Sequence, residues 1–69
     1  MPEFDPLEQA LIKVITEKAG TRDDVVRRAA RLNRNYLKTE FGITLSRLHW
    51  NGHVKYRTDT KEFYRASTP

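Results

Sequence analysis

The chain has 69 residues, 38% of them hydrophobic, and a domain this small buries only about 60% of the surface that its unfolded chain exposes. The chain carries 13 Lys+Arg against 9 Asp+Glu, for a net charge of +4 and an isoelectric point near 9.8, which is typical of a domain that binds nucleic acid. This size leaves little room for an enclosed substrate cavity, and the lack of cysteine excludes a disulfide framework and a thiolate zinc site.

The distribution of apolar residues indicates one domain outside the membrane. No segment has the run of about 18 apolar residues that a membrane span requires, and the N-terminus lacks the pattern of an export signal. We therefore expect no membrane association and a cytoplasmic location, with the nucleoid as the site if the chain is bacterial or viral. Residues 1–6 are expected to form a loose lead-in, residues 7–66 one domain, and residues 67–69 a frayed tail.

The first predicted helix begins near Asp5 and Pro6. An aspartate oxygen can accept hydrogen bonds from the free amides of the first turn, and proline fits the first helical position without losing a needed donor. We predict that this helix ends at Gly20. The stripe of residues at helical period between these points is Leu7, Ala10, Leu11, Val14, Ile15 and Lys18.

A second helix is predicted to begin at Thr21. Asp24 follows at the capping-box spacing, and Asp23 adds negative charge where the helix dipole favours it. The inner face of this helix consists of Val25, Val26, Ala29, Ala30 and Leu32. Its outer face carries arginines that we interpret as solvated ion-pair partners of nearby acids, namely Arg27, Arg28 and Arg31 with Asp23, Asp24 and Glu40.

A third helix is predicted over residues 34–51, after a turn at Asn33. Its inward stripe repeats at i, i+4, i+8 and i+11 and consists of Leu37, Phe41, Leu45 and Leu48, with Thr44 in the same sector. Gly42 could break this helix, which would leave a shorter helix over residues 44–51. We predict a continuous helix, because the apolar stripe stays in phase across the glycine.

A β-hairpin is predicted after Gly52. Val54 and Tyr56 alternate with Lys55 and Arg57, and after a polar turn over residues 58–61 the chain resumes with an aromatic pair at 63–64. The order is therefore helix, helix, helix, hairpin. This order predicts a mainly α fold with a small β-hairpin.

The segment LSRLHWNGHVKYR, residues 45–57, resembles the junction of recognition helix and wing in the winged helix-turn-helix superfamily. The resemblance covers about residues 7–66 and implies a three-helix winged helix-turn-helix fold. The family includes DNA readers, RNA readers and protein-interaction modules. The acids at 23–24 depart from the family's usual pattern, because carboxylates at the start of the second helix would repel a phosphate.

The resemblance implies that helix 34–51 enters the major groove of double-stranded DNA and that the wing, residues 53–65, lies on the backbone. With the predicted stripe inward, Asn35, Thr39 and Ser46 fall on the opposite face, where Asn35 could make a bidentate contact with adenine. The candidate DNA-binding residues are Arg34, Asn35, Lys38, Thr39, Ser46, Lys55, Arg57 and Lys61. An alternative interpretation of the helix residues is that they form an ordinary solvated face without DNA contact. For the wing, the alternative is that its cations prevent edge-to-edge aggregation of strands.

These patterns predict a small DNA-binding protein that regulates transcription. Because one such module contacts few base pairs, specific binding would need a homodimer on a two-fold site or tandem binding. The alternative is a winged-helix module that binds a protein partner through Trp50 and Ile43 and binds no DNA, although we expect Trp50 to fold under the wing or against Phe4. Binding of RNA is a third interpretation. We expect no catalytic residues, no cofactor and no metal, since His49 and His53 lack further ligands.

Overall fold

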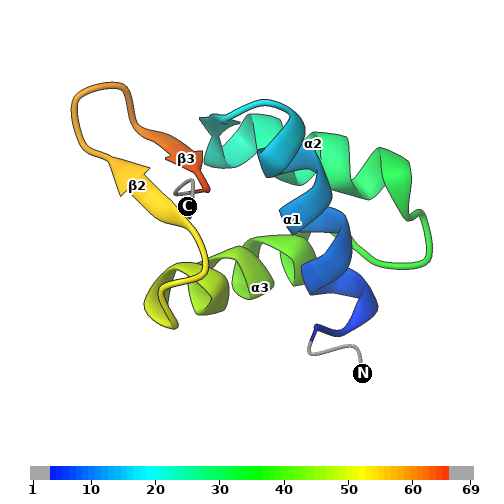
Figure 1. The fold of residues 1–69 in the computed structure, drawn as a ribbon. Helices are drawn as coiled ribbons and strands as arrows, with labels where there is room; N and C mark the ends of the chain where they lie inside the picture. Colours follow the sequence, from blue (N-terminus) through cyan, green and yellow to red (C-terminus); the bar gives the residue numbers. More distant parts are fainter. Residues whose placement is uncertain (1–3, 66–69) are drawn as a thin grey trace.

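A computed structural model describes residues 4–65 as three helices and a small antiparallel sheet (Figure 1). The predicted fold class, a mainly α chain in a three-helix winged-helix layout, is confirmed. Of the predicted ends, residues 1–3 of the lead-in, residue 66 and the tail 67–69 lie outside the described residues. The elements are α1 (Pro6–Glu17), β1 (Gly20–Thr21), α2 (Arg22–Leu32), α3 (Lys38–Trp50), β2 (Lys55–Arg57) and β3 (Glu62–Tyr64).

Helix α1 begins where the sequence predicts and ends earlier. Asp5 Oδ1 accepts from the Glu8 amide at 2.8 Å, and Glu8 Oε1 accepts from the Asp5 amide at 3.0 Å, which forms a capping box. The predicted end at Gly20 is wrong, because the last helical residue is Glu17 and Gly20 belongs to strand β1. The inward stripe therefore ends at Ile15, and Lys18 is an exposed cap residue.

The predicted hairpin is confirmed as β2 and β3, and β3 also pairs with β1, a strand that the sequence does not predict. The strand order is β1-β3-β2, with Gly20 opposite Phe63 and Tyr56 opposite the same phenylalanine on the other side. Strand β1 has two residues, too few to show the alternation that marks a strand. Its pairing fixes the wing to the segment between α1 and α2.

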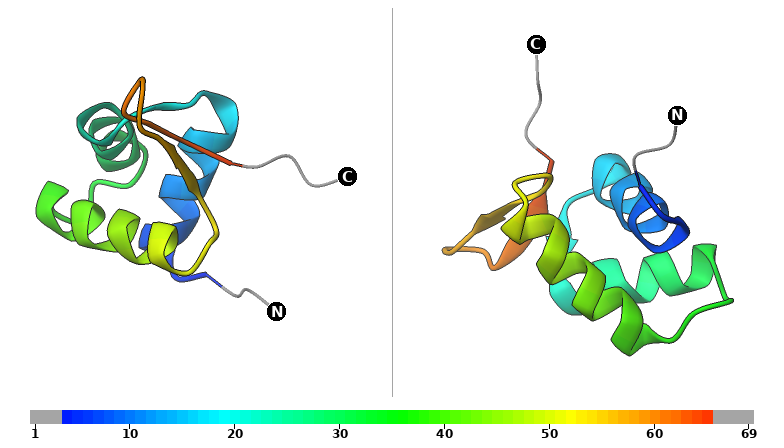
Figure 2. Two further views of the ribbon diagram at one scale, coloured as in Figure 1. Left: turned by 90° about the vertical axis from the view of Figure 1, so that its left-hand side faces the viewer. Right: turned by 90° about the horizontal axis from the view of Figure 1, so that it is seen from below.

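The core lies between the three helices, whose arrangement is seen from two further sides in Figure 2. Phe41, Leu45 and Leu48 of α3 are each 0% exposed, and the wing adds Val54 and Phe63. The predicted inner faces are confirmed except at three exposed residues, Lys18, Leu32 and Leu37. The buried apolar residues are Ala10, Leu11, Val14, Ile15, Val25, Val26, Ala29, Phe41, Leu45, Leu48, Val54 and Phe63.

The start of α3 corrects the prediction. The helix begins at Lys38 rather than at residue 34, and Leu37, expected in the core, is 69% exposed at the cap position. Asn33 Oδ1 accepts from the Asn35 amide at 3.1 Å, and Glu40 Oε1 accepts from the Leu37 amide at 2.8 Å. These side chains satisfy backbone donors in a turn and at a helix start, so the chain does not enter the helix until Lys38.

Two further expectations about helices α2 and α3 have opposite outcomes. Leu32, expected on the inner face of α2, is 48% exposed at the last helical position. The prediction that α3 continues through Gly42 is confirmed.

Gly52 ends α3 in a left-handed conformation. Its φ is +83°, its amide donates to His49 O at 3.0 Å, and the His53 amide donates to Leu48 O at 2.9 Å, which is the Schellman pattern. We expect Gly52→Ala to lower the free energy of unfolding by about 1–2 kcal/mol, since a Cβ is strained at this φ. Urea denaturation followed by far-UV circular dichroism measures the change.

Gly42→Ala is the matched control for this prediction. Gly42 lies inside α3, and an added Cβ would meet Arg22 Nη1 at 3.6 Å, an ordinary contact. Alanine should therefore raise the free energy of unfolding by up to about 1 kcal/mol. Changes of the same sign at both glycines would contradict this assignment of the helix and its cap.

Candidate nucleic-acid interface

The outer face of α3 is directed away from the core. Trp50 follows Phe41 by nine residues, which is half a turn at about 100° per residue, so the two side chains point in opposite directions. Trp50 is 88% exposed and Ile43 is 68% exposed. The expectation that Trp50 folds under the wing or against Phe4 is therefore wrong. Phe4 instead contacts His53, with ring centroids 5.0 Å apart.

Only some of the residues predicted to contact DNA from the third helix lie on α3. Thr39 and Ser46 are exposed on the helix, and Lys38 is its first residue. Asn35 is not on the helix, because it lies in the turn that Asn33 stabilises. Arg34 lies in the same turn and is exposed. The placement of Asn35 beside Thr39 and Ser46 on one helical face is thus wrong.

Arg22 joins the start of α2 to the middle of α3. Its Nη1 donates to Gly42 O at 2.9 Å and its Nη2 donates to Ser46 Oγ at 2.6 Å, while its guanidinium carbon lies 5.7 Å from the centre of the Phe63 ring. The arginine thus fixes the position of α3 relative to α2 and the wing. It also uses one of the two acceptor lone pairs of Ser46 Oγ, so the hydroxyl hydrogen and the second lone pair of that serine are left for a ligand.

Arg22 is not among the residues that the sequence predicts to be functional, although one signal is present. Arg22 is the first residue of α2, and a cation at a helix N-terminus is unfavourable because the helix dipole is positive there. A residue in such a position needs a compensating contact elsewhere. Here the contact is with α3, a partner 20 and 24 residues further along the chain.

We expect Arg22→Ala to lower the free energy of unfolding by about 1 kcal/mol, a value reduced for the solvent exposure of these hydrogen bonds. Arg34→Ala removes the same charge from an exposed turn and should change stability by less than about 0.5 kcal/mol. Urea denaturation of both variants measures the difference. Equal effects would mean that the contacts of Arg22 with Gly42 and Ser46 contribute nothing.

Basic side chains gather where α2 turns into α3. A shallow hollow of about 490 Å³ is lined there by four cationic side chains, together with Ala30, Tyr36 and Leu37. Because Lys38 begins α3, this cluster lies at the N-terminal end of that helix. The four cationic residues are Arg27, Arg31, Arg34 and Lys38.

The arginines of α2 differ in their partners. Arg27 contacts Asp24 at 3.3 Å and Asp23 at 3.9 Å, as the ion-pair interpretation predicts. Arg28 also pairs with Asp24, at 3.1 Å, but it points inward and donates to Val14 O and Lys18 O at the end of α1. It is therefore not a solvated outer residue. Glu40, the third expected partner, caps α3 instead.

The two acids at the start of α2 also differ. Asp24 is held between two arginines, whereas the side chain of Asp23 is 98% exposed. Asp24 therefore presents little net charge to a ligand. From the sequence, both carboxylates are expected to repel an approaching phosphate. In the structure this repulsion comes mainly from Asp23.

The wing presents its cations at the other end of α3. Lys55 and Arg57 on β2 and Lys61 in the turn are all exposed, and the Arg57 guanidinium carbon lies 4.9 Å from the centre of the Tyr64 ring. His49 packs its edge against Tyr56 and Phe63, with centroids 6.1 and 5.8 Å away. These contacts hold the wing beside the C-terminal end of α3.

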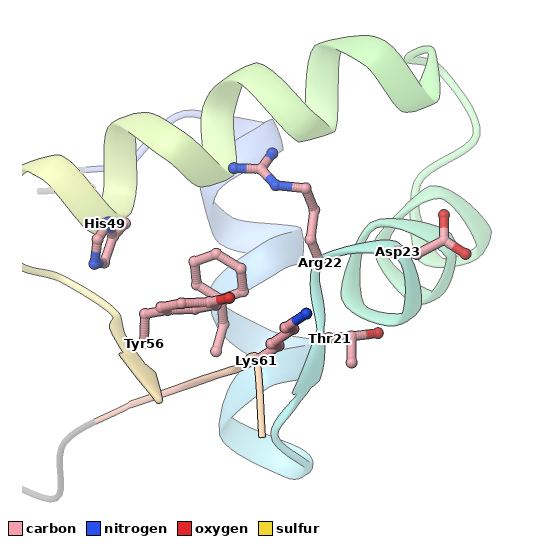
Figure 3. Close-up of a pocket in the computed structure, with 7 residues that line it drawn as sticks. Thr21, Arg22, Asp23, His49, Tyr56 and Lys61 are labelled. Atoms are coloured by element: carbon pink, nitrogen blue, oxygen red, sulfur yellow. The ribbon is translucent and has the colours of Figure 1, made fainter. Parts of the chain in front are cut away.

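A second hollow, of about 600 Å³, lies between the wing, α3 and the start of α2 (Figure 3). Figure 3 shows Arg22 extending toward α3, while Asp23 points to the opposite side of α2. The hollow is lined by Thr21, Arg22, Asp23, His49, Tyr56, Lys61 and Phe63.

Comparisons with protein-family models, with curated proteins and with solved structures return no match to this chain. Within residues 4–65, no helix has the length and apolar character needed to cross a membrane. The same part of the chain contains no group of three or more histidine, aspartate or glutamate side chains placed to hold a metal ion.

Proposed function

We propose that the protein binds double-stranded DNA as a winged helix-turn-helix domain and regulates transcription. Helix α3 enters the major groove, and the wing lies on the adjacent backbone. One observation supports this most: exposed cationic side chains lie at both ends of α3, Arg34 and Lys38 at the turn before it and Lys55, Arg57 and Lys61 on the wing after it. A double helix offers phosphates on both sides of its major groove, which such a distribution of charge matches.

The dimensions of the helix fit this arrangement. Helix α3 has 13 residues, which corresponds to about 20 Å at 1.5 Å per residue, and the major groove is about 12 Å wide. Cations at the two ends of α3 are thus far enough apart to reach phosphates of both strands. Thr39 and the hydroxyl hydrogen of Ser46 lie between them and face the base edges.

One such module covers few base pairs, so binding to a specific site requires two copies on a two-fold sequence or a second bound module. The proposed function requires no cofactor and no catalytic group. Asn35 and Arg34, at the turn before α3, are in a position to contact the backbone rather than the centre of the groove. The proposed role of Asn35 therefore differs from the sequence-based expectation, which is a bidentate contact with adenine.

A protein-interaction module is the second candidate function, and the exposure of Trp50 and Ile43 favours it. Both side chains lie on the outer face of α3, where an apolar pair can form the centre of an interface. The exposed carboxylate of Asp23 also favours a ligand other than DNA. In this case the basic residues of the wing would serve solubility.

Titration of a fluorescently labelled random duplex with the protein at several salt concentrations tests the proposal. We expect binding whose logarithmic association constant falls linearly with the logarithm of salt, because bound cations release counterions from the DNA. An absence of affinity for duplex DNA at low salt would contradict the proposed function. The interaction module would then be the better interpretation.

A further inference from the structure

The outer face of α3 offers the small hydroxyls of Thr39 and Ser46 for hydrogen bonds to bases, and neither can make the bidentate contact that an amide makes. The amide of Asn35 is in the turn, and Ser46 Oγ already accepts from Arg22. The apolar side chains that protrude from this face are Ile43, 68% exposed in the middle of the helix with Thr39 one turn before it, and Trp50, 88% exposed at the C-terminal end. A helix that reads DNA with this face relies on apolar contact at its centre.

The major groove offers one kind of apolar group to such a face. Thymine carries a methyl group at C5, while the other standard bases present hydrogen-bonding atoms and ring edges there. A cytosine methylated at C5 presents the same methyl at the same position. The aliphatic end of Ile43 and the methyl of Thr39 can pack against these groups and exclude water from them.

We propose that Ile43, with Thr39 beside it, reads the C5-methyl groups of pyrimidines in the major groove. Helix α3 then distinguishes thymine from uracil and 5-methylcytosine from cytosine. This inference rests on the proposed binding to DNA, and it names Ile43 as a residue that determines specificity. The exposed side chain of Ile43 thereby has a role in reading DNA instead of in binding a protein.

The charge around Ile43 favours DNA over a second copy of the chain on this face. Two copies stacked through α3 would bring together the cations that flank each helix, Lys38 at one end and the wing at the other, on a chain of net charge +4. Such an approach is repulsive. The phosphates beside a thymine methyl instead carry the opposite charge to these flanks.

Paired duplexes that differ only in C5-methyl groups provide the test. Alternating dA–dT and dA–dU duplexes of about 20 base pairs, two turns of DNA, have the same charge and the same hydrogen-bonding groups. We expect the wild-type protein to bind the dA–dT duplex about fourfold more tightly for each methyl that it buries. Alternating dG–dC duplexes with and without 5-methylcytosine should show a preference of similar size for the methylated form.

Two variants connect the preference to Ile43. Ile43→Ser should bring the dA–dT to dA–dU ratio close to one. Leu37→Ser removes an aliphatic side chain of nearly equal exposure, 69% against 68%, from a position before α3, and should leave the ratio unchanged. Circular dichroism checks that both variants are folded.

Equal wild-type affinity for dA–dT and dA–dU duplexes would overturn the inference and leave the proposed function intact. This is also the result expected if Ile43 serves a protein partner. If Ile43→Ser still preferred the dA–dT duplex, the preference would arise from DNA shape. Ile43 would then not be the residue that contacts the methyl groups, and the inference would be overturned. No binding to any of the four duplexes at low salt would overturn the proposed function, and the inference with it.

Discussion

Replacing Leu45 with alanine is expected to lower the free energy of unfolding by about 2–5 kcal/mol, the cost of a cavity in a packed core. Leu45 is 0% exposed and lies where α3 meets the other helices. A 69-residue domain has a total stability of about 3–10 kcal/mol, so this variant should be largely unfolded at modest urea concentrations. Far-UV circular dichroism is the suitable probe, since Trp50 is 88% exposed and its environment changes little on unfolding.

The same substitution at Leu37 is the control. The sequence places both leucines on one stripe, but Leu37 is 69% exposed at the cap of α3. Leu37→Ala should change the free energy of unfolding by less than about 0.5 kcal/mol. Similar losses at the two leucines would show that Leu37 packs in the core and that α3 begins earlier than Lys38.

The second large effect is expected on DNA binding when the wing loses its cations. Each phosphate contact contributes about 0.9 to the slope of log association constant against log salt. The triple variant Lys55→Ala, Arg57→Ala, Lys61→Ala should therefore reduce the slope by about 2.7 and weaken binding to all sequences alike. Fluorescence anisotropy with two unrelated duplexes, each over a range of salt concentrations, measures both quantities.

Lys13→Ala is the control for the wing variant. It tests whether a loss of slope comes from direct phosphate contacts of the wing or from lower net charge. Lys13 lies on α1 and pairs with Glu17 at 3.5 Å, away from the outer face of α3. Its removal should leave the slope unchanged. If Lys13→Ala lowered the slope as much as one wing substitution, the wing would contribute only through net charge and would not lie on the backbone.

The sequence predicts best the parts of the fold that local interactions determine. Asp5 caps α1 together with Glu8, and Thr21 accepts from the Asp24 amide at the start of α2, so each start is encoded within four residues. The inward stripe of α3 from Phe41 to Leu48 is also correct. Each of these signals depends on spacing along the chain alone.

The start of α3 could not be predicted from spacing, because Leu37 has the right period and lies outside the helix. That boundary is determined by hydrogen bonds that the Asn33 and Glu40 side chains accept from the Asn35 and Leu37 amides. Strand β1 forms only because β3 is beside it. The helical period places Trp50 opposite Phe41, but it does not reveal whether another segment covers the tryptophan, which is 88% exposed.

The candidate site was predictable as a set of charges and only partly as a geometry. The cations of the wing and of the turn before α3 are exposed as the sequence suggests. The predicted position of Asn35 depends on a helix that begins at residue 34. Because α3 begins at Lys38, the predicted position of Asn35 is also wrong. Arg22 was missed because its partners, Gly42 and Ser46, are distant in sequence.

A titration of ¹⁵N-labelled protein with duplex DNA, followed by amide chemical shifts, locates the binding surface residue by residue. If α3 and the wing bind DNA, the largest changes should occur at Lys38, Thr39, Ile43 and Ser46 and along β2 (Lys55–Arg57), while Lys13 and Glu17 on α1 stay constant. Shifts confined to α1, or none at low salt, would contradict the assignment of α3 and the wing as a DNA-binding surface.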